Sequence, residues 1–211
     1  MTEARAPGLD RQGAYDQLYQ AMPLVWSASP GRMVARAAEL LPPGRALDLG
    51  CGDGRNAVWL EQRGWSVDGV DISRAALAAA DRRYAAADHH RVGRLWLADA
   101  STARFPAGEY DLVLTYGLYH CIPDDRIDRL HMSAIRALRS GGLMAFSALD
   151  NRRPLPKDHT TGMLWLRSPS ELRRLMSKIR LLEWEEGEIR EDHRPLVGPH
   201  CHAAVWALAA A

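Results

Sequence analysis

Apolar runs alternate with amphipathic stretches along most of this chain, and the alternation predicts strands and helices in turn. Stretches with helical spacing or helix-forming composition lie at 11–21, 31–41, 54–63, 74–86 and 124–138. Short, largely apolar runs predict strands at 46–50, 66–70, 95–98, 110–115 and 143–148. Strands that alternate with helices form a parallel sheet with helices on both faces, so the sequence predicts an α/β fold.

The last part of the chain departs from this alternation. A further helix is predicted over 169–178, and strands follow near 180–186 and 201–209 with no helix between them. Strands joined without a crossover helix pair antiparallel, here as a hairpin with a long loop at 187–200. The sequence therefore predicts a Rossmann-like sheet of seven strands, mostly parallel, that ends in a C-terminal antiparallel hairpin.

The composition is that of an ordinary soluble globular protein, and it narrows the classes of partner. Of 211 residues, 47% are hydrophobic and 25% are charged, and the formal net charge is +1 without a dense basic block. This balance gives no electrostatic reason to expect a nucleic-acid partner. No apolar run approaches the roughly 18 residues of a membrane span, and the first ten residues lack a signal-peptide core. Three widely spaced cysteines indicate a reducing compartment, so we expect a cytoplasmic protein without membrane contact.

The candidate chemistry begins where the first strand ends, in the stretch ALDLGCGDGR at 46–55. Gly50, Gly52 and Gly54 turn the chain sharply from strand to helix and let a ligand approach without meeting a Cβ atom. Such a turn is expected to aim backbone N–H groups at the ligand, and Asp48 adds a carboxylate at the same edge. The dinucleotide fingerprint reads G-x-G-x-x-G, whereas this stretch reads D-x-G-x-G-x-G. An ordinary tight turn between strand and helix is the alternative.

Acidic residues also end the next two strands. Asp71 follows the second strand, about 20 residues beyond the glycine turn, where an acid binds ribose hydroxyls. Asp99 follows the third strand. Because the carboxyl ends of parallel strands meet at one edge of a sheet, we expect these carboxylates and that of Asp48 to lie on one rim. A helix-capping role for Asp71 and a plain turn role for Asp99 are the alternatives.

These features together resemble class I S-adenosylmethionine-dependent methyltransferases over roughly residues 31–211. The resemblance implies S-adenosylmethionine as cofactor, a seven-stranded sheet, and contacts of Asp99 with the adenine amino group and of Ile72 and Ala100 with the adenine faces. It also implies a helical N-terminal lid over residues 1–30, ahead of a methyltransferase domain at 31–211. The cofactor-binding residues that it implies are Asp48, Gly50, Cys51, Gly52, Gly54, Asn56, Asp71, Ile72, Asp99, Ala100, Tyr15, Tyr19 and Trp26. Tyr15 and Tyr19 have a second interpretation, as anchors of their helix on the core.

The segment after the fourth strand, YGLYHC at 116–121, is the best candidate for contact with the methyl acceptor. His120 has an ordinary pKa of about 6.5 and is a candidate general base at neutral pH, or else a structural hydrogen-bonding group. Tyr116 and Tyr119 are expected to orient the acceptor or to pack in the core. The Asn/Asp-Pro-Pro-aromatic tetrapeptide typical of nucleic-acid amino-methyltransferases does not occur in this segment, which further disfavours nucleic-acid substrates.

Histidines cluster near the C-terminus at His193, His200 and His202. His200 and His202 share a face of a strand, and the three residues are candidates for metal ligands, for polar groups of the acceptor pocket, or for surface residues of an edge strand. Their spacing matches no recognised metal signature, so no metal is predicted. This His-x-His resembles the ends of tellurite-resistance-type methyltransferases. The polar, Pro-rich segment at 151–161 is expected to cover the acceptor.

The sequence therefore predicts an S-adenosylmethionine-dependent methyltransferase that acts on a small-molecule acceptor, as a monomer or a homodimer. One alternative keeps the cofactor and transfers or cyclises its aminocarboxypropyl arm instead. A second is a non-catalytic domain that binds the cofactor. A third is a nicotinamide-dependent oxidoreductase, which the glycine spacing and Asp48 disfavour.

Overall fold

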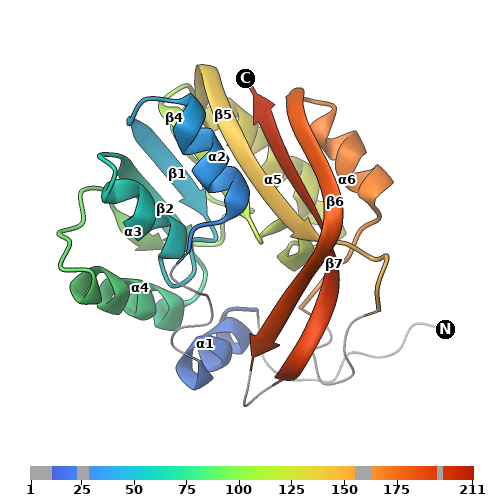
Figure 1. Cartoon of the computed structure of the whole chain (residues 1–211), viewed down its shortest axis with the longest axis horizontal. Coiled ribbons are helices and arrows are strands. Elements are labelled where there is room, and N and C mark those ends of the chain that lie inside the picture. The colour runs from blue at the N-terminus through green and yellow to red at the C-terminus, as the bar shows by residue number, and fades with distance from the viewer. Residues whose placement is uncertain (1–10, 23–28, 155–162, 194–196) are drawn as a thin grey trace.

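The computed structural model describes residues 11–22, 29–154, 163–193 and 197–211, and it describes no side chains at 191–200 (Figure 1). Seven strands form one sheet in the order β3-β2-β1-β4-β5-β7-β6. Their bounds are β1 (Arg45–Leu49), β2 (Ser66–Asp71), β3 (Leu95–Leu97), β4 (Tyr110–Tyr116), β5 (Leu138–Leu149), β6 (Arg180–His193) and β7 (Val197–Ala210). Strands β1 to β5 pair in parallel, whereas β7 pairs antiparallel with both β5 and β6. The predicted fold class is confirmed.

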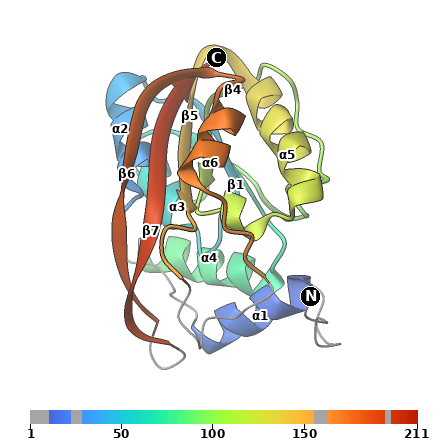
Figure 2. The same cartoon turned by 90° about the vertical axis from the view of Figure 1, so that its right-hand side faces the viewer.

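Helices cover both faces of the sheet because its central strands are apolar on both sides. The helices are α1 (Arg11–Ala21), α2 (Arg32–Leu40), α3 (Arg55–Glu61), α4 (Arg74–Ala86), α5 (Asp124–Ala137) and α6 (Pro169–Met176), with a 3-10 turn η1 (Tyr119–Cys121). On β4, Leu112 and Leu114 pack in the cluster that includes α2 and α3, whereas Val113 between them packs in the cluster that includes α5 and α6. Figure 2 shows α2 and α3 on one side of the sheet and α5 and α6 on the other.

The helices begin and end near the predicted positions, for local reasons that the sequence shows. The Ser73 side chain caps α4 by accepting a hydrogen bond from the backbone N–H of Ala76. Ser168 and Glu171 form a capping box at the start of α6. Acidic residues occupy the first turn of α5 and Arg136 its last turn, where each sign of charge complements the helix dipole.

The C-terminal hairpin differs from the prediction. The loop expected at 187–200 is wrong, because β6 and β7 stay paired through most of it, with Glu191 opposite His200 and Ile189 opposite His202. The charged residues of β6 had indicated a loop in this stretch. On an edge strand such side chains extend into solvent while the backbone still pairs, and their charge discourages pairing with a further chain. The hairpin is therefore long enough to reach the cavity described below.

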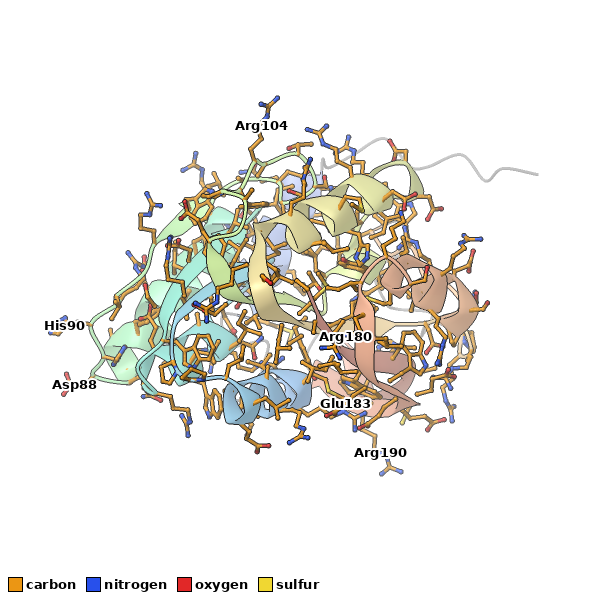
Figure 3. All side chains as sticks on the ribbon, turned by 90° about the horizontal axis from the view of Figure 1, so that it is seen from above. Asp88, His90, Arg104, Arg180, Glu183 and Arg190 are labelled. Atoms are coloured by element: carbon orange, nitrogen blue, oxygen red, sulfur yellow. The ribbon has the colours of Figure 1, made fainter. Side chains whose placement is uncertain are left out.

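Charged side chains of both signs are spread over the surface. Figure 3 shows Asp88 and His90 projecting beside each other at one edge, Arg104 at a second and Arg190 at a third. Within the described ranges, no helix combines the length and the apolar composition that crossing a bilayer requires.

The α5 layer contains a buried histidine. His131 is fully buried, and its Nδ1 lies 2.6 Å from the Tyr119 hydroxyl oxygen. The two rings meet edge to face. Burial, assisted by the charge of Lys178, lowers the pKa of His131 to about 4. The His131 imidazole is therefore neutral at neutral pH.

This lowered pKa predicts a dependence of stability on pH. The unfolded chain binds a proton at His131 below about pH 6.5, and the folded chain resists it down to about pH 4. Keeping His131 neutral therefore adds to the free energy of unfolding above pH 6.5. This addition, on the order of 2–3 kcal/mol, is lost as the pH falls toward 4. Urea unfolding of the wild type and of His131→Gln across this range measures it. The variant is expected to lose less stability on acidification, and identical slopes for the two proteins would contradict the assignment.

Candidate functional site

A cavity of about 510 Å³ lies at the carboxyl ends of the parallel strands. Its walls come from the turn after β1, the end of β2, the segments after β3 and β4, the ends of β5 and β7, and helix α1. In an α/β sheet this edge is where ligands bind, and the volume is within the range of small-molecule sites. Of the residues predicted to bind the cofactor, the lining includes Tyr15, Tyr19, Gly50, Cys51, Gly52, Asn56, Asp71, Ile72, Asp99 and Ala100. Trp26 lies outside the described residues.

The glycine turn has the backbone that the sequence predicts, but its N–H groups point elsewhere. Gly50, Gly52 and Gly54 have φ angles of 72°, 55° and 76°, which are strained for residues with a Cβ atom. The N–H groups of Gly50 and Cys51 both donate to the Val70 carbonyl, and that of Gly54 donates to the Cys51 carbonyl. The expectation that this turn presents bare donors is therefore wrong for these residues. A pyrophosphate needs such donors, so the turn is poorly suited to a dinucleotide.

Asp71 holds the turn against the next strand. Its Oδ2 accepts from the Gly52 N–H at 2.9 Å, and its Oδ1 accepts from the Ser73 N–H at 2.9 Å. The side chain lines the cavity and is only 8% exposed. Burial raises the pKa of Asp71 despite these hydrogen bonds. A ligand hydroxyl that donates to this carboxylate would stabilise its ionised form.

Asp48 is a buried acid at the end of β1 whose Oδ2 has no hydrogen-bond partner among the described residues. Burial, and then the charge of Asp71, raises the pKa of Asp48 to about 7, while Arg55 opposes the shift. Asp48, which was predicted to bind the cofactor, is not one of the described residues that line the cavity, so we expect any effect on a ligand to come through its charge. Unsatisfied negative charge at this edge favours a cationic ligand.

Asp99 lines the cavity, but arginines already engage its carboxylate. Its Oδ1 accepts from both the N–H and the hydroxyl of Ser101, and its Oδ2 accepts from Arg11 at 3.1 Å and Arg126 at 3.2 Å. Partial burial alone would raise the pKa of Asp99, but the Ser101 hydrogen bonds and the two arginines lower it overall. Its contact with an adenine amino group stays a prediction, and that contact would share the carboxylate with Arg11.

Two polar side chains, Asp16 and Arg11, fasten α1 beside the cavity, and neither contact was predicted from the sequence. Asp16 accepts from the Ser73 hydroxyl at 2.6 Å and from the Ala75 N–H at 3.0 Å, at the start of α4. Arg11 bonds Asp99 and the Cys121 carbonyl. Figure 1 shows α1 lying below α4, at the edge of the sheet where β1 and β2 end. These two charged residues on one short helix were the feature of the sequence that could have indicated the contacts.

The segment after β4 places its three predicted residues differently. Tyr116 lines the cavity, and its hydroxyl accepts from the Arg32 N–H at 3.1 Å. The expectation that Tyr119 orients the acceptor is wrong, because its side chain is fully buried against His131 and Phe146. Tyr119 is not among the described lining residues. The alternative interpretation of Tyr119, packing in the core, is the one the structure supports.

His120 lines the cavity and is held by two backbone N–H groups. Its Nδ1 accepts from the Leu149 N–H at 3.0 Å, and its carbonyl accepts from the Trp165 N–H at 2.7 Å. This geometry conflicts with the expectation that His120 acts as a general base, because Nδ1, the nitrogen that lacks a proton, is already used by a donor.

Arg167 is a positioning residue that the sequence analysis did not identify. It is 6% exposed, and it donates to the carbonyls of Tyr119 at 2.8 Å and Ile122 at 2.9 Å. Its charge is balanced by Asp124 at 2.6 Å. Arg167 therefore fixes both ends of the segment that contains His120. An arginine in the otherwise apolar stretch MLWLR at 163–167 was the signal.

The C-terminal histidines are only partly described. His202 is 3% exposed on β7, whereas the side chains of His193 and His200 lie outside the described set. The described residues contain no group of three or more His, Cys, Asp or Glu side chains placed to hold a metal ion. Most of the segment expected to cover the acceptor, residues 155–162, also lies outside the described ranges.

Comparisons with known proteins agree with this geometry. Residues 46–142 match the family described as a methyltransferase domain. The ubiquinone biosynthesis O-methyltransferase of Alkalilimnicola ehrlichii is 32% identical over 145 residues, which cover 69% of this chain and 55% of that protein. The ribosomal RNA small subunit methyltransferase C of Alcanivorax borkumensis is 33% identical over 105 residues, covering 48% of this chain and 31% of that protein. The chain thus spans about half or less of the length of these relatives.

The match indicates a methyltransferase domain at residues 46–142. TehB from Haemophilus influenzae has the same fold, with a TM-score of 0.74 and 18% identity over 95% of this chain and 67% of that chain. The 1,6-didemethyltoxoflavin-N1-methyltransferase of Burkholderia thailandensis, solved with S-adenosylhomocysteine, gives a TM-score of 0.70 and 18% identity over 98% of this chain and 92% of that chain. At this identity the two structures establish the fold alone.

S-adenosylmethionine is the cofactor that we expect for this domain, and the residues at the edge of the sheet fit it. The cofactor has a sulfonium and an ammonium group, which suit the Asp48 carboxylate, whose Oδ2 has no hydrogen-bond partner among the described residues. It has no phosphate, which suits a turn whose N–H groups are used internally. Its ribose hydroxyls are donors that Asp71 can accept. These contacts are our expectations for the methyltransferase domain.

The pKa of Asp48 predicts that cofactor affinity depends on pH. A bound cation favours the ionised carboxylate, so binding should release a proton and strengthen as the pH rises through about 7. We expect the dissociation constant to fall roughly five- to tenfold between pH 6 and pH 7.5. Calorimetry with Asp48→Asn is the matched control, because titration of the ligand's own amino group affects both proteins equally. A wild type whose pH dependence equals that of the variant would refute the role of Asp48.

Removing the charge of Asp71 should weaken cofactor binding. We expect Asp71→Asn to lower the affinity by about 1–3 kcal/mol, the scale of a lost charged hydrogen bond. Asp81→Asn, an exposed acid of α4 paired with Arg91, is the control and should bind as the wild type does. Circular dichroism of both variants checks that the fold persists. Unchanged affinity in folded Asp71→Asn would remove this residue from the site.

Proposed function

We propose that this protein transfers the methyl group of S-adenosylmethionine to a small-molecule acceptor. The observation that supports this most is the extent of the cavity. One continuous space of about 510 Å³ borders the acidic edge at Asp71 and also a second wall of mostly apolar side chains. The second wall comprises Leu118, Leu149, Met163, Leu164, Ile189 and Trp206. A partly open cavity of this kind suits a small, largely apolar acceptor beside the cofactor.

The residues divide into a cofactor part and an acceptor part in this proposal. Asp71 binds the ribose, Ile72 and Ala100 flank the adenine, and Asn56 supports the rim by accepting from the Gly31 N–H at 2.9 Å. Tyr116 and His120 lie toward the apolar wall and contact the acceptor. Within the predicted lid at 1–30, helix α1 acts as the cover, while residues 1–10 and 23–28 lie outside the described residues. Residues 31–211 form the methyltransferase domain.

Methyl transfer requires mainly that the protein align the acceptor with the methyl group and exclude water. The cofactor supplies a methyl group that its positively charged sulfur already activates. The chain's own residues must place the acceptor in line with that methyl group and keep solvent out. The contacts of Arg11 and Asp16 hold α1 over the cavity, which serves both purposes.

A ribosomal RNA acceptor is a second candidate, because one relative is a ribosomal RNA methyltransferase. The net charge of +1 and the mixed surface charges disfavour it, since RNA binding relies on clustered positive charge. Ribosomal subunits therefore belong in any acceptor panel, where we expect no methylation of them.

The products of the reaction separate the remaining alternatives. We expect incubation with a panel of phenols, carboxylates, amines and thiols to yield S-adenosylhomocysteine together with a methylated acceptor, measured by mass spectrometry. Methylthioadenosine as the product would instead show transfer or cyclisation of the aminocarboxypropyl arm. Tight cofactor binding without turnover of any acceptor would favour a binding domain and contradict the proposed function.

A further inference from the structure

Three neighbouring strands place a row of side chains on one face of the sheet at the cavity. Tyr116 of β4 pairs with Ser147 of β5, and Ser147 pairs with Trp206 of β7. Residues paired directly across strands point to the same face of a sheet. All three residues line the cavity. The row is therefore one continuous part of the cavity wall, with Ser147 between the two aromatic residues.

Contacts with the start of α2 hold both aromatic residues of this row in place. The Tyr116 hydroxyl accepts from the Arg32 N–H at 3.1 Å, and the Gly31 backbone lies so close to the Tyr116 ring that a Cβ atom at Gly31 would overlap it. The guanidinium carbon of Arg32 lies 3.9 Å from the centre of the Trp206 ring. Turning either ring would disturb the start of α2, so the surroundings of Ser147 are preformed.

Ser147 contributes a hydroxyl group to this row. The residue is only 8% exposed, and its hydroxyl makes no hydrogen bond to any residue that the structure describes. Its neighbours in the wall, Leu149 on the same strand and Trp206 on β7, are largely apolar. A buried hydroxyl without a partner costs about 1–3 kcal/mol, so a polar atom in the cavity that bonds it gains in affinity.

Positive charge lies at the Tyr116 end of the row. The guanidinium carbon of Arg55 lies 5.9 Å from the centre of the Tyr116 ring, and Arg32 contacts the Tyr116 hydroxyl. Burial raises the pKa of Tyr116, and the charges of Arg55 and Arg32 oppose this shift. Glu185 of β6 pairs with Arg32 and balances part of this charge. The surroundings of the row therefore favour an oxygen of a ligand over a cationic nitrogen.

We propose that the Ser147 hydroxyl forms a hydrogen bond with an oxygen atom of the methyl acceptor and thereby orients it in the cavity. This inference rests on the proposed methyl transfer, and it names the acceptor class: a largely apolar compound that carries a hydroxyl or a carboxylate group. Leu149, Ile189 and Trp206 contact its apolar body. A hydrogen bond from a fixed position on β5 orients a molecule that apolar packing alone would leave free to turn.

Four probes of similar size test this contact in the protein saturated with S-adenosylhomocysteine. Each is a methyl-substituted benzene: p-cresol has a hydroxyl, p-toluate a carboxylate, p-methylbenzylamine a cation and p-xylene no polar group. In ligand-observed NMR titrations we expect p-cresol or p-toluate to bind about tenfold more tightly than p-xylene, and p-methylbenzylamine no more tightly than p-xylene. The tighter of the two oxygen probes identifies the group as a hydroxyl or a carboxylate.

Ser147→Ala isolates the hydroxyl, and Ser140→Ala is the matched control, because Ser140 is an exposed serine of the same strand. We expect Ser147→Ala to bind the preferred oxygen probe about five- to tenfold more weakly and to bind p-xylene as the wild type does, which also checks that the wall is intact. Ser140→Ala should keep every affinity.

An oxygen preference that survives in Ser147→Ala would overturn the inference. Equal binding of all four probes to the wild type, or detectable binding of none, would overturn it as well. The product of turnover tests the proposed function separately. A wild type that binds the probes as expected but releases methylthioadenosine would refute methyl transfer, whereas release of S-adenosylhomocysteine with a preference independent of Ser147 would refute only this contact.

Discussion

The site depends on one buried carboxylate that joins two turns of the sheet. Asp71 accepts the N–H of Gly52 with one oxygen and the N–H of Ser73 with the other. It therefore fixes the glycine turn after β1 relative to the start of α4. Ser73 in turn binds Asp16, so the same group also determines where α1 lies. The rim of the cavity, the start of α4 and the covering helix all take their positions from this carboxylate.

Several acidic side chains are buried at one edge of the sheet, and this favours a cationic ligand over an anionic one. Arg83 balances the fully buried Asp53 at 2.6 Å, whereas Asp48 keeps an oxygen without a partner among the described residues. The backbone donors of the glycine turn are used within the protein, so an anion finds little to bind there. A glycine-rich turn whose N–H groups at Gly50, Cys51, Gly52 and Gly54 bond within the protein is poorly suited to a phosphate, and we expect it to serve a cationic cofactor instead. This difference links the spacing of the motif to its ligand.

The sequence predicted the sheet, its strand types and the acidic rim, because apolar periodicity and strand-end acids are local patterns. It did not predict features that depend on contacts between distant segments. Tyr119 was indistinguishable from Tyr116 in the sequence, yet one is in the core and the other at the cavity. The anchoring of His120 depends on the N–H of Leu149, 29 residues away, and on Arg167. The full length of the hairpin could not be predicted, because its paired strands contain charged residues that are typical of a loop but that an edge strand also tolerates.

We infer that the edge of the sheet bearing Asp48 and Asp71 binds an adenosyl sulfonium rather than a dinucleotide. Isothermal titration calorimetry with S-adenosylmethionine and NAD in parallel tests it most directly. We expect saturable binding of S-adenosylmethionine at one site and no heat of binding with NAD. Saturable binding of NAD, with no response to S-adenosylmethionine, would contradict it.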